Sequence, residues 1–455
     1  MALAWGLKAV VGLAWLGMRK KRHRPPDLNR DHARPRTAPA PSSEAMEARL
    51  ADLVSPATYA LAEQYRSLGL RWRVLSLPVM VALVLGVIWR QVPSISTAAR
   101  LLARESLLWA PPVRVSQQAL SQRLRCLPAE LFREVLREVL PTLLARAHAR
   151  RRPHPQVIAR ALAHFPCLLV ADATTLEAVF KRVGALRGAD GTLLGGKLLG
   201  LLDLPSKQPV ELWLGEDANA NEKSFGDRLL AALPEGALLL VDKGFYAFAF
   251  FDRLTEGGRW FVTRARALAA FRVERVLLDT PLVRDRVIRL GVYRSNPCRH
   301  PVRLVEVLVG GEWRGYLTNV LDPEVLPAAD VVDLYGRRWR IEEAFLVVKR
   351  LLGLSYLWTG AANGVAMQVW ATWLLYAVLI DLSDAVAEEL EVPLDRVSVE
   401  MVYRGLYHFT VAFQRGEATD PVAYLATQPD LGTLKRRRKH RERKPLDLSI
   451  QELNL

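Results

Sequence analysis

Residues 168–176 read Leu-Leu-Val-Ala-Asp-Ala-Thr-Thr-Leu. The first four residues form an apolar run, and the acid Asp172 ends it. Residues 238–246, Leu-Leu-Leu-Val-Asp-Lys-Gly-Phe-Tyr, repeat this pattern around Asp242, and Gly244 is placed to supply a positive φ after the strand. Ligands of open sheets gather beyond the carboxyl ends of the strands. The two runs therefore predict two buried strands that carry two carboxylates to one edge of a sheet. Taken singly, each aspartate is more often a turn or helix-cap residue than a metal ligand.

The surrounding sequence predicts an α/β fold. Further short apolar runs bounded by Gly, Pro, Asp or Asn are typical of strands, and they cover residues 197–204, 210–214 and 260–263. Residues 221–233 have helical spacing. Residues 271–317 alternate between apolar and polar side chains, which predicts a separate antiparallel β insertion, and helical spacing returns from about Ala328.

Residues 335–349 form the sharpest pattern, Tyr-Gly-Arg-Arg-Trp-Arg-Ile-Glu-Glu-Ala-Phe-Leu-Val-Val-Lys. On one regular helix, at 100° per residue, four polar side chains fall within a sector of about 60°: Tyr335, Arg338, Glu342 and Lys349. Four apolar residues are expected to hold the helix in the core: Trp339, Ile341, Phe345 and Val348. The alternative interpretation is a solvated helix face with an ordinary Arg338–Glu342 ion pair.

Together, the two strand-terminal aspartates and Glu342 make a candidate metal site. Carboxylate oxygens without nitrogen or sulfur ligands suit Mg²⁺ or Mn²⁺. A near-match to a phosphate-binding P-loop at residues 191–197 is rejected, because Leu198 replaces the required Ser or Thr and a strand-like run follows where a helix is needed. We therefore expect no ATP.

These patterns resemble the DDE transposases of bacterial insertion sequences, in particular the insertion-sequence-four family. Its signature is Tyr, two residues, Arg, three residues, Glu, six residues, Lys, and residues 335–349 match it at every interval. The aspartate contexts are similar too: Asp172-Ala-Thr-Thr-Leu matches the family's D-x-T-x-L, and Asp242-Lys-Gly-Phe matches D-x-G-[FY]. The resemblance covers about residues 66–385.

The resemblance implies an RNase H-like catalytic domain with a β-strand insertion. It implies that Asp172, Asp242 and Glu342 bind two Mg²⁺ or Mn²⁺ ions and catalyse cleavage and strand transfer on double-stranded DNA, at the element's terminal inverted repeats and in target DNA. Tyr335, Arg338 and Lys349 would then hold DNA phosphates. A catalytically silent, transposase-derived DNA-binding protein and a plain metal-dependent nuclease are the alternatives.

The helical spacing of apolar residues before the first strand predicts an all-helical N-terminal domain, which we expect to bind DNA. Its helix near residues 116–124 carries the candidate base readers Ser116, Gln117 and Arg123, although a solvated helix with an Ala119 and Leu120 core face fits the same pattern. Some transposases of this group stack a flipped base on a tryptophan of the insertion. Trp313 lies at a suitable place for this role, with Trp260 and ordinary core packing as competing interpretations.

Charge separates the two ends of the 455-residue chain from its body. The net charge is +16; residues 19–36 carry eight basic and two acidic residues and residues 435–444 eight basic and one acidic, so these segments supply +13. We expect the 435–444 tail to bind DNA without sequence preference. The expected parts are a flexible basic leader (1–45), the helical domain (46–165), the catalytic domain (166–270 and 318–390) around the insertion (271–317), and a C-terminal helical segment with the tail (391–455).

Cysteine usage and hydropathy predict a cytoplasmic protein outside the membrane. Three scattered cysteines offer neither a disulfide framework nor a zinc site, and the apolar runs 74–89 and 369–380 are short for a membrane span and fit buried helices. Because a transposon has two ends and the sequence has one set of acids, we also expect a homodimer on paired DNA ends. We expect the two copies to meet through apolar residues after Leu354, with burial in the protein's own core as the alternative: Trp370, Trp373, Leu374, Leu375 and Tyr376.

Overall fold

The computed structural model describes residues 44–67, 73–92, 94–176, 196–215, 217, 219–266, 270–354, 358 and 361–435. Its contacts separate Met1–Pro39 from Ala40–Leu455, and everything below concerns the second unit. Three segments lie outside the described residues: residues 191–195 of the rejected P-loop match, the leader up to residue 43 and the tail beyond Lys435. The predicted domain boundaries stay predictions.

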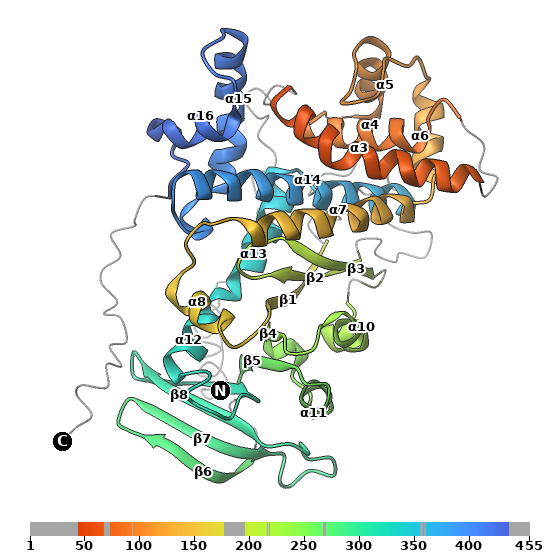
Figure 1. Ribbon diagram of the computed structural model, residues 1–455. Coiled ribbons are helices and arrows are strands. Elements are labelled where there is room, and N and C mark those ends of the chain that lie inside the picture. Colours follow the sequence, from red (N-terminus) through yellow and green to blue (C-terminus); the bar gives the residue numbers. More distant parts are fainter. Residues whose placement is uncertain are drawn as a thin grey trace, which may run out of the picture. The chain divides into compact units, whose positions relative to one another are not determined.

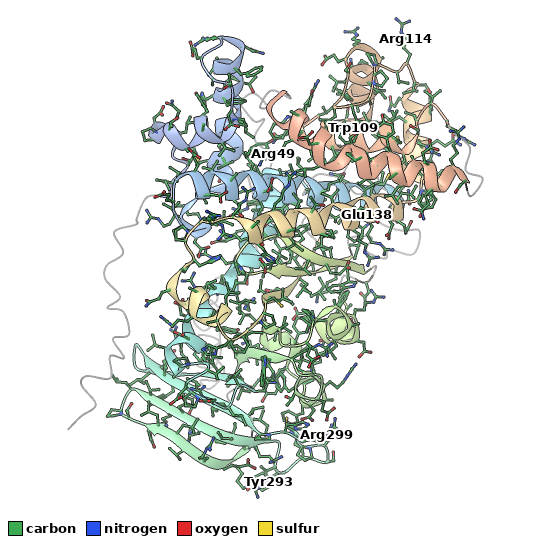
Figure 2. All side chains as sticks on the ribbon, in the orientation of Figure 1. Arg49, Trp109, Arg114, Glu138, Tyr293 and Arg299 are labelled. Atoms are coloured by element: carbon green, nitrogen blue, oxygen red, sulfur yellow. The ribbon has the colours of Figure 1, made fainter. Side chains whose placement is uncertain are left out.

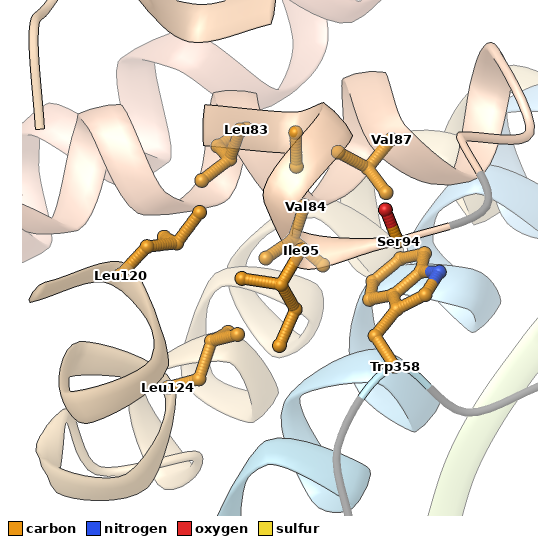
Figure 3. A pocket seen from close by; sticks show the side chains of 9 residues that line it. Leu83, Val84, Val87, Ser94, Ile95, Leu120, Leu124 and Trp358 are labelled. Atoms are coloured by element: carbon orange, nitrogen blue, oxygen red, sulfur yellow. The ribbon is translucent and has the colours of Figure 1, made fainter. Parts of the chain in front are cut away.

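Helices precede the sheet, as predicted, and no strand occurs among the described residues up to 167. They are α3 (Glu44–Ser67), α4 (Leu77–Trp89), α5 (Ile95–Arg104), α6 (Gln117–Cys126), α7 (Glu130–Ala149) and α8 (Gln156–Leu162). Figure 3 shows the apolar contact of α4, α5 and α6 with Trp358, around a cavity of about 20 Å³. That space is too small and too apolar for a ligand, so the contact is core packing.

The first five strands place the predicted aspartates. They are β1 (Leu168–Thr175), β2 (Lys197–Asp203), β3 (Pro209–Gly215), β4 (Leu238–Val241) and β5 (Trp260–Arg264). β1, β2 and β3 are antiparallel neighbours, whereas β1, β4 and β5 are parallel. The carboxyl ends of β1 and β4 therefore meet at the same edge, with Ala171 opposite Val241.

Each face of this sheet is buried in its own core, because side chains alternate along a strand. Leu168 and Val170 of β1 belong to the larger core with the N-terminal and C-terminal helices, whereas Leu169 and Ala171 pack into a second core. That second core holds η2 (Glu222–Phe225), α10 (Gly226–Ala232), η3 (Lys243–Phe245) and α11 (Phe248–Glu256). The sheet thus lies between two helical layers (Figure 1).

Residues 271–317 form antiparallel strands as predicted, but they are not a separate sheet. The strands β6 (Phe271–Asp279), β7 (Val283–Leu290), β8 (Val302–Val309) and β9 (Glu312–Thr318) continue the first five in the order β3-β2-β1-β4-β5-β9-β8-β7-β6. β9 pairs with β5, with Val262 opposite Thr318, and the Asn319 side chain accepts a hydrogen bond from the Phe261 amide at 2.9 Å. The pairing of β9 with β5 satisfies the backbone hydrogen-bonding groups at the edge of the first five strands. The alternating pattern of the insertion does not show which strand it pairs with.

The chain then returns across the sheet as α12 (Ala328–Arg337), α13 (Trp339–Leu346) and a π-helical turn, η4 (Val347–Leu351). The remaining elements are α14 (Ala362–Glu389), η5 (Leu394–Arg396), α15 (Val399–Gln414), α16 (Pro421–Thr427) and η6 (Pro429–Leu431). The predicted single regular helix over 335–352 is therefore wrong in detail, because Arg338 ends one helix and the π turn changes the residue period from 347 onward.

Helix α14 is the central helix of the larger core and lies beside α7 (Figure 1). It is the one described helix long and apolar enough to cross a membrane, but 94% of its most apolar window is buried within the protein. The expected dimer contact on this helix is wrong: Trp373, Leu375 and their neighbours are buried in the protein's own core. A helix that is apolar on all sides is typical of such a position.

Candidate active site

The structure brings the three predicted acids around one cation. Asp172 lies in β1, Asp242 directly follows β4, and Glu342 lies on α13. The Arg338 guanidinium donates to Asp172 and, at 3.2 Å, to Glu342 Oε1, and its Nη2 lies 3.9 Å from Asp242 Oδ1. The Arg338–Glu342 ion pair of the alternative interpretation is present too, but it forms part of this larger cluster rather than a solvated helix face.

The position of α13 follows from its apolar side chains. Ile341 is fully buried and lies against Gly200 of β2, where an added Cβ would be 3.5 Å from Ile341 Cδ1. Phe345 packs edge-on against Trp373 of α14 at 5.9 Å between ring centroids. Trp339 does not help, since 58% of it is exposed and it lies 5.4 Å from the Arg338 guanidinium. The expectation that Trp339 holds the helix in the core is wrong.

Tyr335 fixes the second aspartate. Its hydroxyl donates to Asp242 Oδ1 at 3.1 Å, and its ring packs edge-on against Tyr316 of β9 at 5.3 Å. Burial, together with the Asp242 charge, raises the pKa of Tyr335 against the opposing effect of Arg338. The phenol therefore stays protonated and acts as a donor to the carboxylate.

Lys349 reaches the site from the π-helical turn. Its amino group donates to the Thr174 hydroxyl and to the Thr175 carbonyl, the latter at 2.9 Å, at the end of β1. Burial lowers the pKa of Lys349 to about 8. No described carboxylate forms an ion pair with it, so its charge is left for a group outside the described residues. π turns inside helices are frequent at functional sites.

The electrostatics favour a bound cation. Burial raises the pKa of Asp172 to about 6, although Arg338 and the Ala173 amide oppose this. Three carboxylates here share a single described guanidinium. As arranged, no three Asp, Glu, His or Cys side chains within the described ranges lie close enough together to hold a metal ion. The carboxylate oxygens themselves suit Mg²⁺ or Mn²⁺ by their chemistry, and metal binding would require the acids to exchange their contacts with Arg338 for contacts with the ion.

Sequence reasoning missed a fourth acid, Glu222, which begins η2. Its Oε2 is shielded from water without a hydrogen-bond partner, and a Cβ added to Gly244 would lie 1.7 Å from that oxygen. Burial raises the pKa of Glu222; Lys197 lowers it, Asp242 raises it and Arg338 lowers it. Gly244 does not have a positive φ, so the predicted reason for this glycine is wrong, and close approach of Glu222 explains it instead. Glu222 lies in a segment predicted as helical, and no motif or spacing around it distinguishes it from an ordinary surface acid.

The predicted DNA-contacting residues lie at α6 and on β9, elements that carry none of the three acids. Ser116 caps α6 by accepting from the Ala119 amide at 3.1 Å, and Arg123 donates to the Leu75 carbonyl at 2.8 Å. Gln117 is exposed. Trp313 is 36% exposed, with the Arg284 guanidinium 4.2 Å from its ring centroid. Trp260 packs edge-on against Phe165.

The fold and site define a mixed α/β domain in which acids from two neighbouring parallel strands and a helix converge. Asp242 follows β4 as predicted, whereas Asp172 lies within β1, which continues to Thr175, so the prediction that Asp172 ends its strand is wrong. Residues 163–377 match the model of a family described as "Transposase DDE domain". This match encloses Asp172, Asp242 and Glu342 as well as Tyr335 and Lys349.

Two relatives accompany this match. The chain is 27% identical to "Putative transposase y4zB" of Sinorhizobium fredii over 199 residues, which are 42% of this chain and 54% of that protein. The chain thus spans about half the length of this relative. It is also similar to a cryo-EM structure of a piggyBac transposase synaptic complex with hairpin DNA, at 12% identity and a TM-score of 0.41, over 88% of this chain and 86% of the other.

Proposed function

We propose that this protein is a DNA transposase of the DDE type. The observation that carries the proposal is the meeting of Asp172, Asp242 and Glu342 around Arg338, inside the residues that match a transposase DDE domain. The order of elements supports an RNase H-like catalytic domain: three strands, a helix, the strand before Asp242, a fifth strand, the insertion and the glutamate helix. The four-residue signature in residues 335–349 supports the insertion-sequence-four family.

The acids would hold two divalent ions, Mg²⁺ or Mn²⁺, and these would activate a water or a DNA 3′-hydroxyl and stabilise the leaving oxygen of the phosphodiester. The protein's own cations would hold the substrate: Arg338 can contact a phosphate with two N–H groups, and Lys349 as a point charge. Tyr335 orients Asp242 through its 3.1 Å hydrogen bond. Nothing in this scheme uses ATP.

A supercoiled donor plasmid that bears the element's ends, incubated with the full chain and Mg²⁺, tests the proposal. A transposase excises the element and joins its 3′ ends to target DNA. A nuclease would cut without joining, and a silent DNA-binding protein would shift the DNA without cutting. Either of these two results would overturn the proposed function.

The proposed partners are double-stranded DNA and a second copy of this chain, with action in the cytoplasm. Two element ends must be cut in a coordinated way, whereas the sequence provides one set of the three acids, so we propose at least two chains per complex. Because α14 is buried, their contact has to lie elsewhere. The mass of the complex with end DNA tests this, and a cleavage-competent species with a single chain would contradict it.

A further inference from the structure

Glu222 is the acid near the site that neither the sequence signature nor the scheme above uses. It begins η2, the turn between β3 and α10, and its carboxylate lies directly over the Cα of Gly244. Gly244 is two residues beyond Asp242, so η2 and η3 bring Glu222 and Asp242 to the same end of the sheet. The charges of Asp172 and Glu222 also influence each other.

The described contacts give Glu222 no structural role. Its Oε2 is buried without a hydrogen-bond partner, and the nearby Lys197 amino group donates instead to the Ala220 carbonyl at 2.7 Å. A buried carboxylate oxygen without a donor is costly in free energy, and the charge of Asp242 adds repulsion. A cation at this place would remove both costs.

Charge balance points the same way. The acids Asp172, Asp242, Glu342 and Glu222 carry four negative charges, which face the described cations Arg338 and Lys197. Arg338 would turn toward DNA phosphates in the proposed reaction, which leaves the acids further from neutrality. Two divalent ions carry four positive charges, enough to balance all four carboxylates.

We propose that Glu222 is a fourth carboxylate of the active site, which binds a divalent cation together with Asp242. This inference rests on the proposed function and deepens it, because it assigns a residue to one of the two cation positions. It also gives Gly244 a purpose, since any side chain there would displace the Glu222 carboxylate.

The first test measures Mn²⁺ binding to the full-length chain, without DNA, by electron paramagnetic resonance. We expect Glu222→Gln to weaken Mn²⁺ binding by about tenfold or more, as loss of a metal-site partner does. It should not lower the free energy of unfolding in metal-free buffer, because it removes a buried charge whose Oε2 has no donor among the described residues. Glu343→Gln is the matched control, because no described contact joins Glu343 to the acid cluster and it pairs instead with Arg340, at 2.8 Å. This variant should bind Mn²⁺ like the unaltered protein.

The second test uses the close approach at Gly244. Gly244→Ala keeps every charge but places a Cβ where the Glu222 oxygen now lies, so we expect a loss of Mn²⁺ affinity similar to that of Glu222→Gln. Glu222→Ala makes room for that Cβ. In this background Gly244→Ala should cause little further loss, so that the two effects are not additive.

The outcomes separate this inference from the proposed function. If Asp172→Asn abolishes Mn²⁺ binding while Glu222→Gln retains it, the role of Glu222 is overturned and the proposed function stands. A Glu222→Gln variant that is less stable without metal but has unaltered Mn²⁺ affinity assigns a structural role and also overturns the inference. If the unaltered chain binds no Mn²⁺ and cuts no DNA, both fail together.

Discussion

Two clusters of buried charge differ in their balance of acids and bases. The α14 ion cluster joins three acids of α14 to four arginines of α3, α7 and the segment after α7: Asp381, Asp384 and Glu388 with Arg49, Arg146, Arg150 and Arg152. The catalytic acid cluster joins Asp172, Asp242 and Glu342 to Arg338. Figure 2 labels Arg49, which pairs with Asp381 at 3.1 Å.

This difference in charge balance indicates different roles: the α14 ion cluster stabilises the fold, whereas the catalytic acid cluster is suited to bind a cation. In the α14 ion cluster four arginines face three acids and each acid has at least one arginine, so the cluster ties the N-terminal helices to the central helix and has no excess of negative charge. In the catalytic acid cluster the acids outnumber their described cationic partner three to one. Excess negative charge at the edge of a sheet is unfavourable without a cation, and this is the physical basis for a metal site.

The largest expected effect comes from the catalytic acid cluster. Asp172→Asn, Asp242→Asn and Glu342→Gln should each abolish DNA cleavage, because each removes a metal-ligand charge with little change of volume. Binding of end DNA should remain largely intact, since none of these acids attracts phosphate. Stability without metal should hardly change, because the change relieves a surplus of negative charge. Cleavage of the donor plasmid, a gel-shift assay and urea unfolding measure the three effects.

A variant that cleaves like the unaltered protein would remove that acid from the metal site. A variant that also unfolds at much lower urea would show that the acid belongs to a structural cluster, and the comparison between the two clusters would then fail at that residue.

The next effect is on stability and belongs to the α14 ion cluster. Arg152→Ala should destabilise the protein by about 3–5 kcal/mol, because it leaves the fully buried Asp384 without its closest partner. Urea unfolding measures the loss. Metal affinity of the folded fraction should be unchanged. A loss below about 1 kcal/mol would mean that Arg150, 3.3 Å from Asp384, suffices for the pairing.

The sequence predicted the meeting of the three acids because their placement follows from local rules. Two neighbouring parallel strands bring Asp172 and Asp242 together, and helical spacing brings Glu342 and Arg338 to one face. The five strands before residue 265 and the helices before residue 165 were predicted for the same reason, as runs with a clear period and clear boundaries.

Tertiary contacts decided what the sequence could not. The joining of β9 to β5, the burial of Trp373 on all sides and the exposure of Trp339 depend on which surfaces meet, and no period in the sequence specifies this. The π turn at Val347–Leu351 breaks the constant helical angle from which the position of Lys349 was predicted. Glu222 escaped notice because its partner in space, Gly244, lies 22 residues away in the sequence.

A moderate effect of pH on Mn²⁺ affinity is expected at the catalytic acid cluster. Burial raises the pKa of Asp172 to about 6 in the metal-free protein, and a proton competes with a cation for the same oxygens. Mn²⁺ affinity should therefore fall as the pH falls through about 6, rather than near 4, where an ordinary aspartate takes up its proton. Electron paramagnetic resonance titrations between about pH 5 and 8 measure this. A midpoint near 4 would show that the cluster is better solvated than the structure indicates.

The smallest expected effect is at Glu343, the acid next to Glu342. It lies about 100° further round the helix, about half of its side chain is exposed, and it pairs with Arg340 at 2.8 Å. Exposed pairs contribute little, and Arg340 keeps a second partner in Asp395 at 3.1 Å. Glu343→Gln should therefore lower stability by less than about 0.5 kcal/mol and retain most of the cleavage activity, measured beside Glu342→Gln on the same donor plasmid. If the two variants lost activity equally, position on the helix face would not distinguish a catalytic acid from its neighbour. The convergence on Arg338 would then no longer identify the site.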